Sequence, residues 1–222
     1  MNRYELEAKL ARALGGGLSE AYRELMRQLG DPPDIANVSA EYWQNGWRDI
    51  QKQVEPILVE AFVASAEDAM LRLEFGVDWD LVNMDAVNWA RVHTESVLSD
   101  LFRKRYDFVG ENVARYFEEG WSISDLARRL RAWYDPVRAE MIAITETTRA
   151  VVEGERFVIA QLEKESGNKM IPVWSTANDE RVCLICGARH GKEITDGIYP
   201  PAHPRCRCLV VYRLPKPKER TR

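Results

Sequence analysis

Cysteine is missing from most of this sequence of 222 residues. None occurs before Cys183, and all four lie between that position and Cys208. Chance rarely produces such crowding, so the segment 174–213 is predicted to be a compact site. Long apolar runs are also missing, and none approaches the ~20 residues that a membrane-spanning helix needs. We therefore expect no membrane partner.

Recognisable targeting and catalytic motifs are missing as well. The N-terminal residues MNRYELEAKLARAL are charged and helical in pattern, so we expect no signal peptide and a reducing cytoplasm. In that compartment, closely spaced cysteines favour metal ligation over disulfides. The chain has no Gly-rich phosphate loop, no nucleophile elbow, and no zinc-protease or deaminase signature. The sequence thus favours a protein that is not an enzyme.

Charge is plentiful but unevenly distributed around a formal net charge of −4. From Arg181 to the end, ten Lys and Arg residues accompany three acids, whereas the preceding part holds 21 basic and 32 acidic residues. This asymmetry predicts that any contact with a polyanion is made by the C-terminal end, a solvated tail being the alternative. The candidate contact residues are Arg181, Arg189, Arg205, Arg207 and Arg213.

Apolar residues at helical spacing predict a mainly α-helical fold before the cysteines. Residues 1–34 are predicted to form a hairpin of two helices, 3–14 and 19–29, because the glycine run 15–17 would end the first. Gly30 would end the second.

Residues 35–168 are predicted to form the helical body. Ser39 would cap a helix reaching about Phe75, with a kink or a split at Pro56, which lacks an amide hydrogen. Inside the last helix, residues 145–149 have indifferent helix propensity, so we expect tertiary contacts to hold them. A structural pairing of Glu146 or Arg149 with a neighbouring element is favoured there over catalysis. Further helices are predicted over 85–106, up to Gly120, after Ser122 or Ser124, and from Pro136 to about 168.

Residues 169–213 are predicted to be a small C-terminal α+β module. The short runs 170–174 and 209–212 are apolar and rich in β-branched residues, and they could pair to close its base. Residues 214–222 form a basic tail without an apolar anchor.

The module offers five candidate ligands for the four places of a structural zinc: Cys183, Cys186, His203, Cys206 and Cys208. We expect the first three and one of Cys206 or Cys208, because a Cys-x-Cys pair in an extended segment points to opposite faces. Zinc would supply the stability that so small a loop lacks. A metal-free cluster of buried groups and a redox pair at Cys183 and Cys186 remain open.

A catalytic metal would need an open position and a general base. His190, Glu193 and Asp196 are the acid–base groups near the cysteines in sequence. A zinc-dependent nucleic-acid-processing enzyme and a zinc-stabilised DNA-binding module are therefore the alternative functions.

Three blocks, WSTANDERVCLIC (174–186), GK (191–192) and PPAHPRCRC (200–208), resemble the signature of the phage Mu F-like head-morphogenesis (minor capsid) proteins. Upstream, GWSISDLA (120–127) and ITETTRA (144–150) are similar to the family's short helix and Thr-Glu helix. The resemblance covers about residues 85–213. Val182 and Ile144 depart from the threonine and arginine that family members often carry.

The resemblance implies a tailed-phage protein, present in few copies, that joins the portal protein during procapsid assembly. Capsid or scaffold proteins would be further partners. It implies a place in the virion, in the capsid interior near the portal vertex, and in the host cytoplasm during assembly. The basic end would contact packaged DNA or an acidic portal surface. No catalytic residues come with the resemblance.

Overall fold

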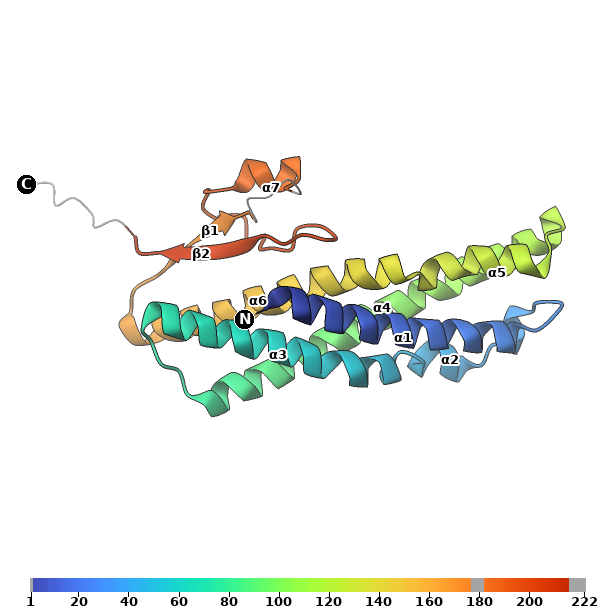
Figure 1. The fold of residues 1–222 in the computed structure, drawn as a ribbon, viewed down its shortest axis with the longest axis horizontal. Coiled ribbons are helices and arrows are strands. Elements are labelled where there is room, and N and C mark those ends of the chain that lie inside the picture. Colours follow the sequence, from blue (N-terminus) through green and yellow to red (C-terminus); the bar gives the residue numbers. More distant parts are fainter. Residues whose placement is uncertain (1, 177–181, 216–222) are drawn as a thin grey trace, which may run out of the picture. The chain divides into compact units, whose positions relative to one another are not determined.

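The computed structural model describes residues 2–176 and 182–215. It confirms a mainly helical chain with a small antiparallel sheet near its C-terminal end (Figure 1). None of the described helices is both long and apolar enough to cross a membrane. The larger elements are α1 (Arg3–Leu29), α2 (Ala40–Asn45), α3 (Arg48–Leu73), α4 (Trp79–Glu119), α5 (Ile123–Arg131), α6 (Pro136–Ser166), β1 (Ile171–Ser175), α7 (Leu184–Arg189) and β2 (Leu209–Arg213), and two short 3₁₀ turns, η1 (Ile35–Asn37) and η2 (Ala132–Tyr134), complete them.

The chain divides into two compact units. Unit 1 contains Met1–Arg3, Leu58–Ala86 and Ile144–Arg222, and unit 2 contains Tyr4–Ile57 and Val87–Ala143. The predicted domain boundaries at residues 34, 168 and 213 remain predictions.

The first helix corrects the predicted hairpin. α1 runs without a break through the glycine run 15–17, so the two expected helices are one. A Cβ atom on Gly17 would lie 2.6 Å from Cγ1 of Ile50 in α3, so glycine permits a close approach there. Burial of a continuous leucine face outweighs the ~1 kcal/mol that each glycine costs a helix. The fully buried leucines on both sides of the run are Leu10, Leu14, Leu18, Leu25 and Leu29.

Two other predicted helix boundaries are wrong. Ser39 caps a helix as expected, but that helix ends at Asn45, and no split occurs at Pro56, which lies inside α3. The alternative, a kink at Pro56, remains a prediction. Pro56 is exposed, so water can reach the carbonyl that its missing amide would have bonded. The helices predicted before and after residue 106 form one helix of 41 residues, α4, because buried Val109 continues its inner face.

Aromatic side chains fill much of unit 2. The hydroxyls of Tyr42 and Tyr134 lie 2.9 Å apart, and that of Tyr42 donates to the Ala21 carbonyl at 3.0 Å. The guanidinium carbon of the fully buried Arg105 lies 3.8 Å from the ring centre of Phe102 and 4.3 Å from that of Tyr134. These two ring faces offset part of the cost of burying the charge.

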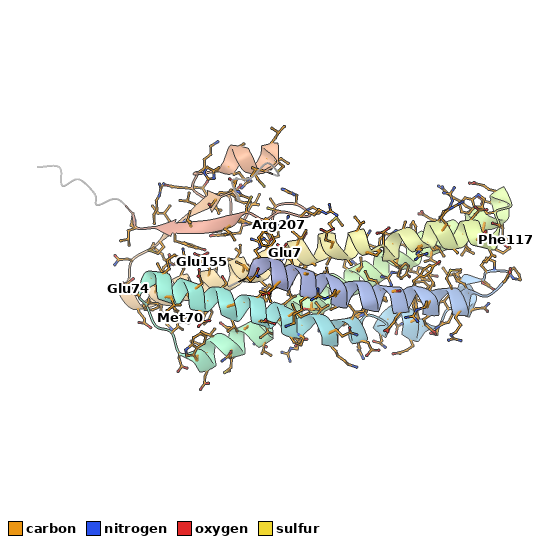
Figure 2. The ribbon with its side chains drawn as sticks, viewed as in Figure 1. Glu7, Met70, Glu74, Phe117, Glu155 and Arg207 are labelled. Carbon is orange, nitrogen blue, oxygen red and sulfur yellow. The ribbon has the colours of Figure 1, made fainter. Side chains whose placement is uncertain are left out.

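In unit 1, α3 and α6 cross closely. Gly154 of α6 faces the backbone of Phe62 in α3, where a Cβ atom would lie 3.0 Å from the Phe62 carbonyl carbon. An ion pair between Arg72 and Glu155, 2.6 Å long, joins the same two helices (Figure 2 labels Glu155). The crossing fixes the part of α6 that packs against the C-terminal module.

Candidate metal centre

The Cys/His segment rests on three paired stretches of backbone: β1, β2 and residues 191–194. β1 and β2 pair antiparallel with Trp174 opposite Val210, which confirms the predicted strand pair (Figure 1). The other edge of β1 binds the segment 191–194, where the Ile194 amide donates to the Pro172 carbonyl at 2.8 Å. Trp174, Val210 and Ile194 pack with Val152 of α6 into a small core. The flanking strands therefore close the base of the module as expected.

The Cys183-x-x-Cys186 spacing forms a tight turn into α7. Cys183 is the N-terminal cap of this helix, and its Sγ accepts from the Cys186 amide at 3.4 Å. The turn brings both sulfurs to one side, where His203 meets them. Its Nε2 lies 3.2 Å from Sγ of Cys183 and 3.2 Å from Sγ of Cys186.

These distances fit a tetrahedral metal ion. Bonds of ~2.3 Å to sulfur and ~2.0 Å to nitrogen place two sulfurs about 3.8 Å apart and a sulfur and a nitrogen about 3.5 Å apart. Cys186 Sγ and Cys206 Sγ are separated by 3.8 Å, and the two sulfur–nitrogen distances are slightly shorter than the ideal. The donor set is therefore able to hold a metal ion.

Both cysteines of the Cys-x-Cys pair point toward the cluster, which corrects the expectation that they face opposite sides. Cys186, Cys206 and Cys208 form one group of buried sulfurs, and Cys186 also belongs to the group with Cys183 and His203. A turn at Arg205, which has a φ of 62°, precedes the pair, and β2 begins only after it, at residue 209. Cys186 thus connects all five predicted ligands.

The thiols of the buried group differ in acidity. A hydrogen bond from Cys208 lowers the pKa of Cys206 to about 5, and the same bond and then burial raise the pKa of Cys208. Burial raises the pKa of Cys186 to about 12. The hydrogen bond therefore favours the thiolate form of Cys206, and a bound cation would promote loss of the proton from Cys186.

Helix α6 holds the loop that carries His203 and Cys206. The hydroxyl of Thr148 lies 2.6 Å from the Cys206 carbonyl, and the guanidinium of Arg3 donates to the same hydroxyl oxygen. The hydroxyl of Thr145 accepts from the Arg205 amide at 3.0 Å. The expected tertiary contacts of residues 145–149 are confirmed, but the sequence did not show that their partner is the cysteine loop. The only indication of these contacts in the sequence was that hydroxyl residues lie in the interior of a predicted helix.

Replacing Thr148 with valine is expected to destabilise unit 1 by about 1–3 kcal/mol, since the Cys206 carbonyl and Arg3 would lose a buried partner. Thr147→Val is the matched control. Its hydroxyl is equally buried and, among the described residues, lacks a hydrogen-bond partner, so valine should be neutral or stabilising there. Urea unfolding measures both variants. Equal effects would show that the loop is not anchored through Thr148.

The acid–base groups near the cysteines are engaged elsewhere. Nδ1 of His190 accepts from the Thr176 amide at 3.1 Å. Glu193 and Asp196 pair with arginines at 2.7 Å each. None of these three groups belongs to a metal-ligand group among the described residues.

Four of the five arginines predicted to contact a polyanion lie within the described residues. Arg189 pairs with Asp196, and Arg213 pairs with Glu193, so both have an internal acid partner. Arg205 is exposed beside the cluster, and Arg207, labelled in Figure 2, lies partly exposed just before β2. Arg181 lies outside the described residues. The contact itself remains a prediction.

Residues 107–211 match the sequence model of a family described as Phage Mu protein F like protein. The match covers the end of α4, then α5, α6 and the module through the Cys/His segment. It begins later than residue 85, where the resemblance was expected to start. Searches of curated proteins and of solved structures found no match.

Proposed function

Because residues 107–211 match the sequence model of the phage Mu F-like family, we propose that the chain is a minor head protein acting in phage head morphogenesis. Its partners in this role are the portal protein and the capsid or scaffold proteins. It works in the host cytoplasm during assembly and stays in the virion near the portal vertex. The family match across α6 and the Cys/His module carries the proposal.

In this role the module holds a structural zinc ion. Cys183, Cys186 and His203, which form one group, supply three of the ligands, and Cys206, whose Sγ lies 3.8 Å from that of Cys186, supplies the fourth. The zinc ion cross-links two loops that share only a small core, and so stabilises their folded arrangement. Cys208 donates its thiol hydrogen to Cys206 and orients that ligand, as partners behind metal ligands commonly do.

A closed site supports a structural role over a catalytic one. Four protein ligands leave no position for substrate or water. The nearby groups able to act as general base, His190, Glu193 and Asp196, bind Thr176 or arginines instead. Metal-dependent nucleic-acid cleavage that His203→Ala abolishes would favour the enzyme alternative.

The surface beside the metal site then contacts the partner. Arg205 and Arg207 flank Cys206, so their positions depend on the same loop that zinc fixes. Their charges suit the phosphates of packaged DNA or the carboxylates of an acidic portal surface.

Co-expression with the portal protein of the same phage is expected to yield a complex that co-purifies through an affinity tag on either partner. The double variant Arg205→Ala/Arg207→Ala should reduce recovery of that complex. Arg115→Ala, a change of an exposed arginine on α4, is the matched control and should not reduce it. Failure of the wild-type chain to co-purify would contradict the assembly role. Tight binding to duplex DNA without any portal contact would instead favour the DNA-binding module.

A further inference from the structure

A groove in unit 2 follows α1 on one side and α2 with the start of α3 on the other (Figure 1 labels the three helices). Its volume is about 330 Å³, within the range of ligand pockets. The lining residues of α1 extend from Gly17 to Gln28, which corresponds to about 16 Å along the helix axis. Those of the other wall extend from Ser39 to Gln53. The groove therefore offers room for a short segment of chain.

The floor of the groove is apolar. Four of its lining residues are buried: Gly17, Ala21, Tyr42 and Ile50. The hydroxyl of Tyr42 is already engaged, because it donates to the Ala21 carbonyl at 3.0 Å. A floor of this kind accommodates the alkyl stems of lysine and arginine, whose charged heads stay in water at the rim.

Only acids supply charge to the lining of the groove. Its four carboxylates come from both walls and belong to Glu20, Glu24, Glu41 and Asp49, whereas no lysine or arginine of the described residues lines it. Two of these acids have counter-ions from outside the lining, since Arg27 pairs with Glu24 and Lys52 pairs with Asp49. Glu20 and Glu41 have no salt bridge in the part of the chain that the structure describes, and Glu41 accepts only from the neutral Asn45 amide. One unbalanced negative charge therefore lies on each wall.

The spread of the four carboxylates indicates which kind of cation fits the groove. Among the described residues, none of them belongs to a group of converging metal ligands, so a single divalent ion does not suit them. Phosphate would be repelled by both walls, which excludes nucleic acid as the occupant. Charges on opposite walls above an apolar floor suit several cationic heads on flexible alkyl stems.

We propose that this groove binds a basic segment of a partner protein, which presents two or more lysine or arginine side chains. Their alkyl stems lie on the floor beside Ala21 and Ile50, and their heads pair with Glu20 and Glu41. The proposal goes beyond the assembly role and does not depend on the metal centre.

The probe is the peptide Gly-Lys-Ala-Lys-Ala-Lys-Gly-amide carrying a neutral fluorophore, and fluorescence anisotropy measures its binding to the full-length chain. The same peptide with all three lysines acetylated keeps its length and loses its charge, so it should bind at least about fivefold more weakly at low salt. Equal binding of the two peptides would overturn the proposal. Unlabelled spermidine, which carries three charges without a peptide chain, should compete only weakly. Competition as strong as that of the unlabelled peptide would assign a polyamine site instead.

A double variant tests whether the two unbalanced acids attract the peptide. Glu20→Gln/Glu41→Gln should weaken its binding about fivefold at low salt, because exposed ion pairs contribute up to about 1 kcal/mol each. Glu111→Gln/Glu118→Gln removes the same charge from exposed acids of α4 outside the groove and should leave binding unchanged. Equal weakening by the two pairs would show diffuse attraction to an acidic protein and would contradict the assignment, as would unchanged binding in both.

An added charge tests the position of the groove from the opposite direction. Gln53→Lys places a cation on an exposed lining residue and should weaken peptide binding, because it neutralises part of the attraction. Gln44→Lys adds the same charge to an exposed residue of α2 outside this groove and should have a smaller effect. Thermal melting confirms that every variant folds. A larger effect of Gln44→Lys would place the peptide elsewhere.

Discussion

Replacing Cys186 with alanine is expected to abolish metal binding and to unfold the C-terminal module. Cys186 is 1% exposed and belongs to both candidate ligand groups, so its loss removes the only link between them among the described residues. Structural zinc contributes on the order of 10 kcal/mol to folding of small metal-held domains. Near-ultraviolet circular dichroism would report the loss through the buried Trp174. Chelator treatment of the wild-type chain should reproduce it.

Cys206 and Cys208 provide the matched comparison. Cys206→Ala should behave like Cys186→Ala, because it removes a ligand. Cys208→Ala removes only the hydrogen-bond donor behind Cys206, so metal affinity should fall by roughly 10- to 100-fold while saturating zinc still restores the fold. The reverse order of effects would make Cys208 the ligand. Unchanged melting of Cys186→Ala would contradict a metal-held module.

Replacing Gly154 with alanine is expected to destabilise unit 1 by about 3 kcal/mol. The added methyl group would collide with the backbone carbonyl of Phe62, and a backbone cannot yield as a side chain can. A hydrogen bond from Ser65 Oγ to the Val151 carbonyl, 2.7 Å long, holds the helices together at the same crossing. Relief of the collision therefore requires α3 and α6 to separate.

Gly16→Ala is the control for Gly154→Ala. Gly16 is also inside a helix, but a Cβ atom there meets nothing within 4 Å. Alanine should stabilise that helix by about 0.5–1 kcal/mol. Urea unfolding compares the two variants. A Gly154→Ala chain as stable as the wild type would show that the helices do not cross this closely.

Helix caps, strands and the Cys-x-x-Cys turn could be predicted because each depends on residues that are close together in the sequence. Ser39 and Ser122 cap their helices through their own side chains, so the sequence around each residue was sufficient. The strands of the module were recognisable because apolar, β-branched runs flank the cysteines, and the Cys-x-x-Cys spacing by itself specifies a turn that joins two sulfurs.

Features that depend on distant residues were not predictable in the same way. The glycine run in α1 looked like a helix end because Ile50, which makes glycine favourable at position 17, is far away in sequence. Thr148 meets the Cys206 carbonyl across 58 positions, and the turn at Arg205 redirects Cys206 in a manner that a Cys-x-Cys spacing does not reveal. Tertiary packing decides each of these cases.

X-ray absorption at the zinc edge of the purified chain tests the proposed zinc site. A closed site of Cys183, Cys186, Cys206 and His203 should show one zinc ion bound by three sulfurs at ~2.3 Å and one nitrogen at ~2.0 Å. Protein purified without zinc that still melts cooperatively, or zinc with an oxygen ligand in an open position, would contradict a structural metal centre.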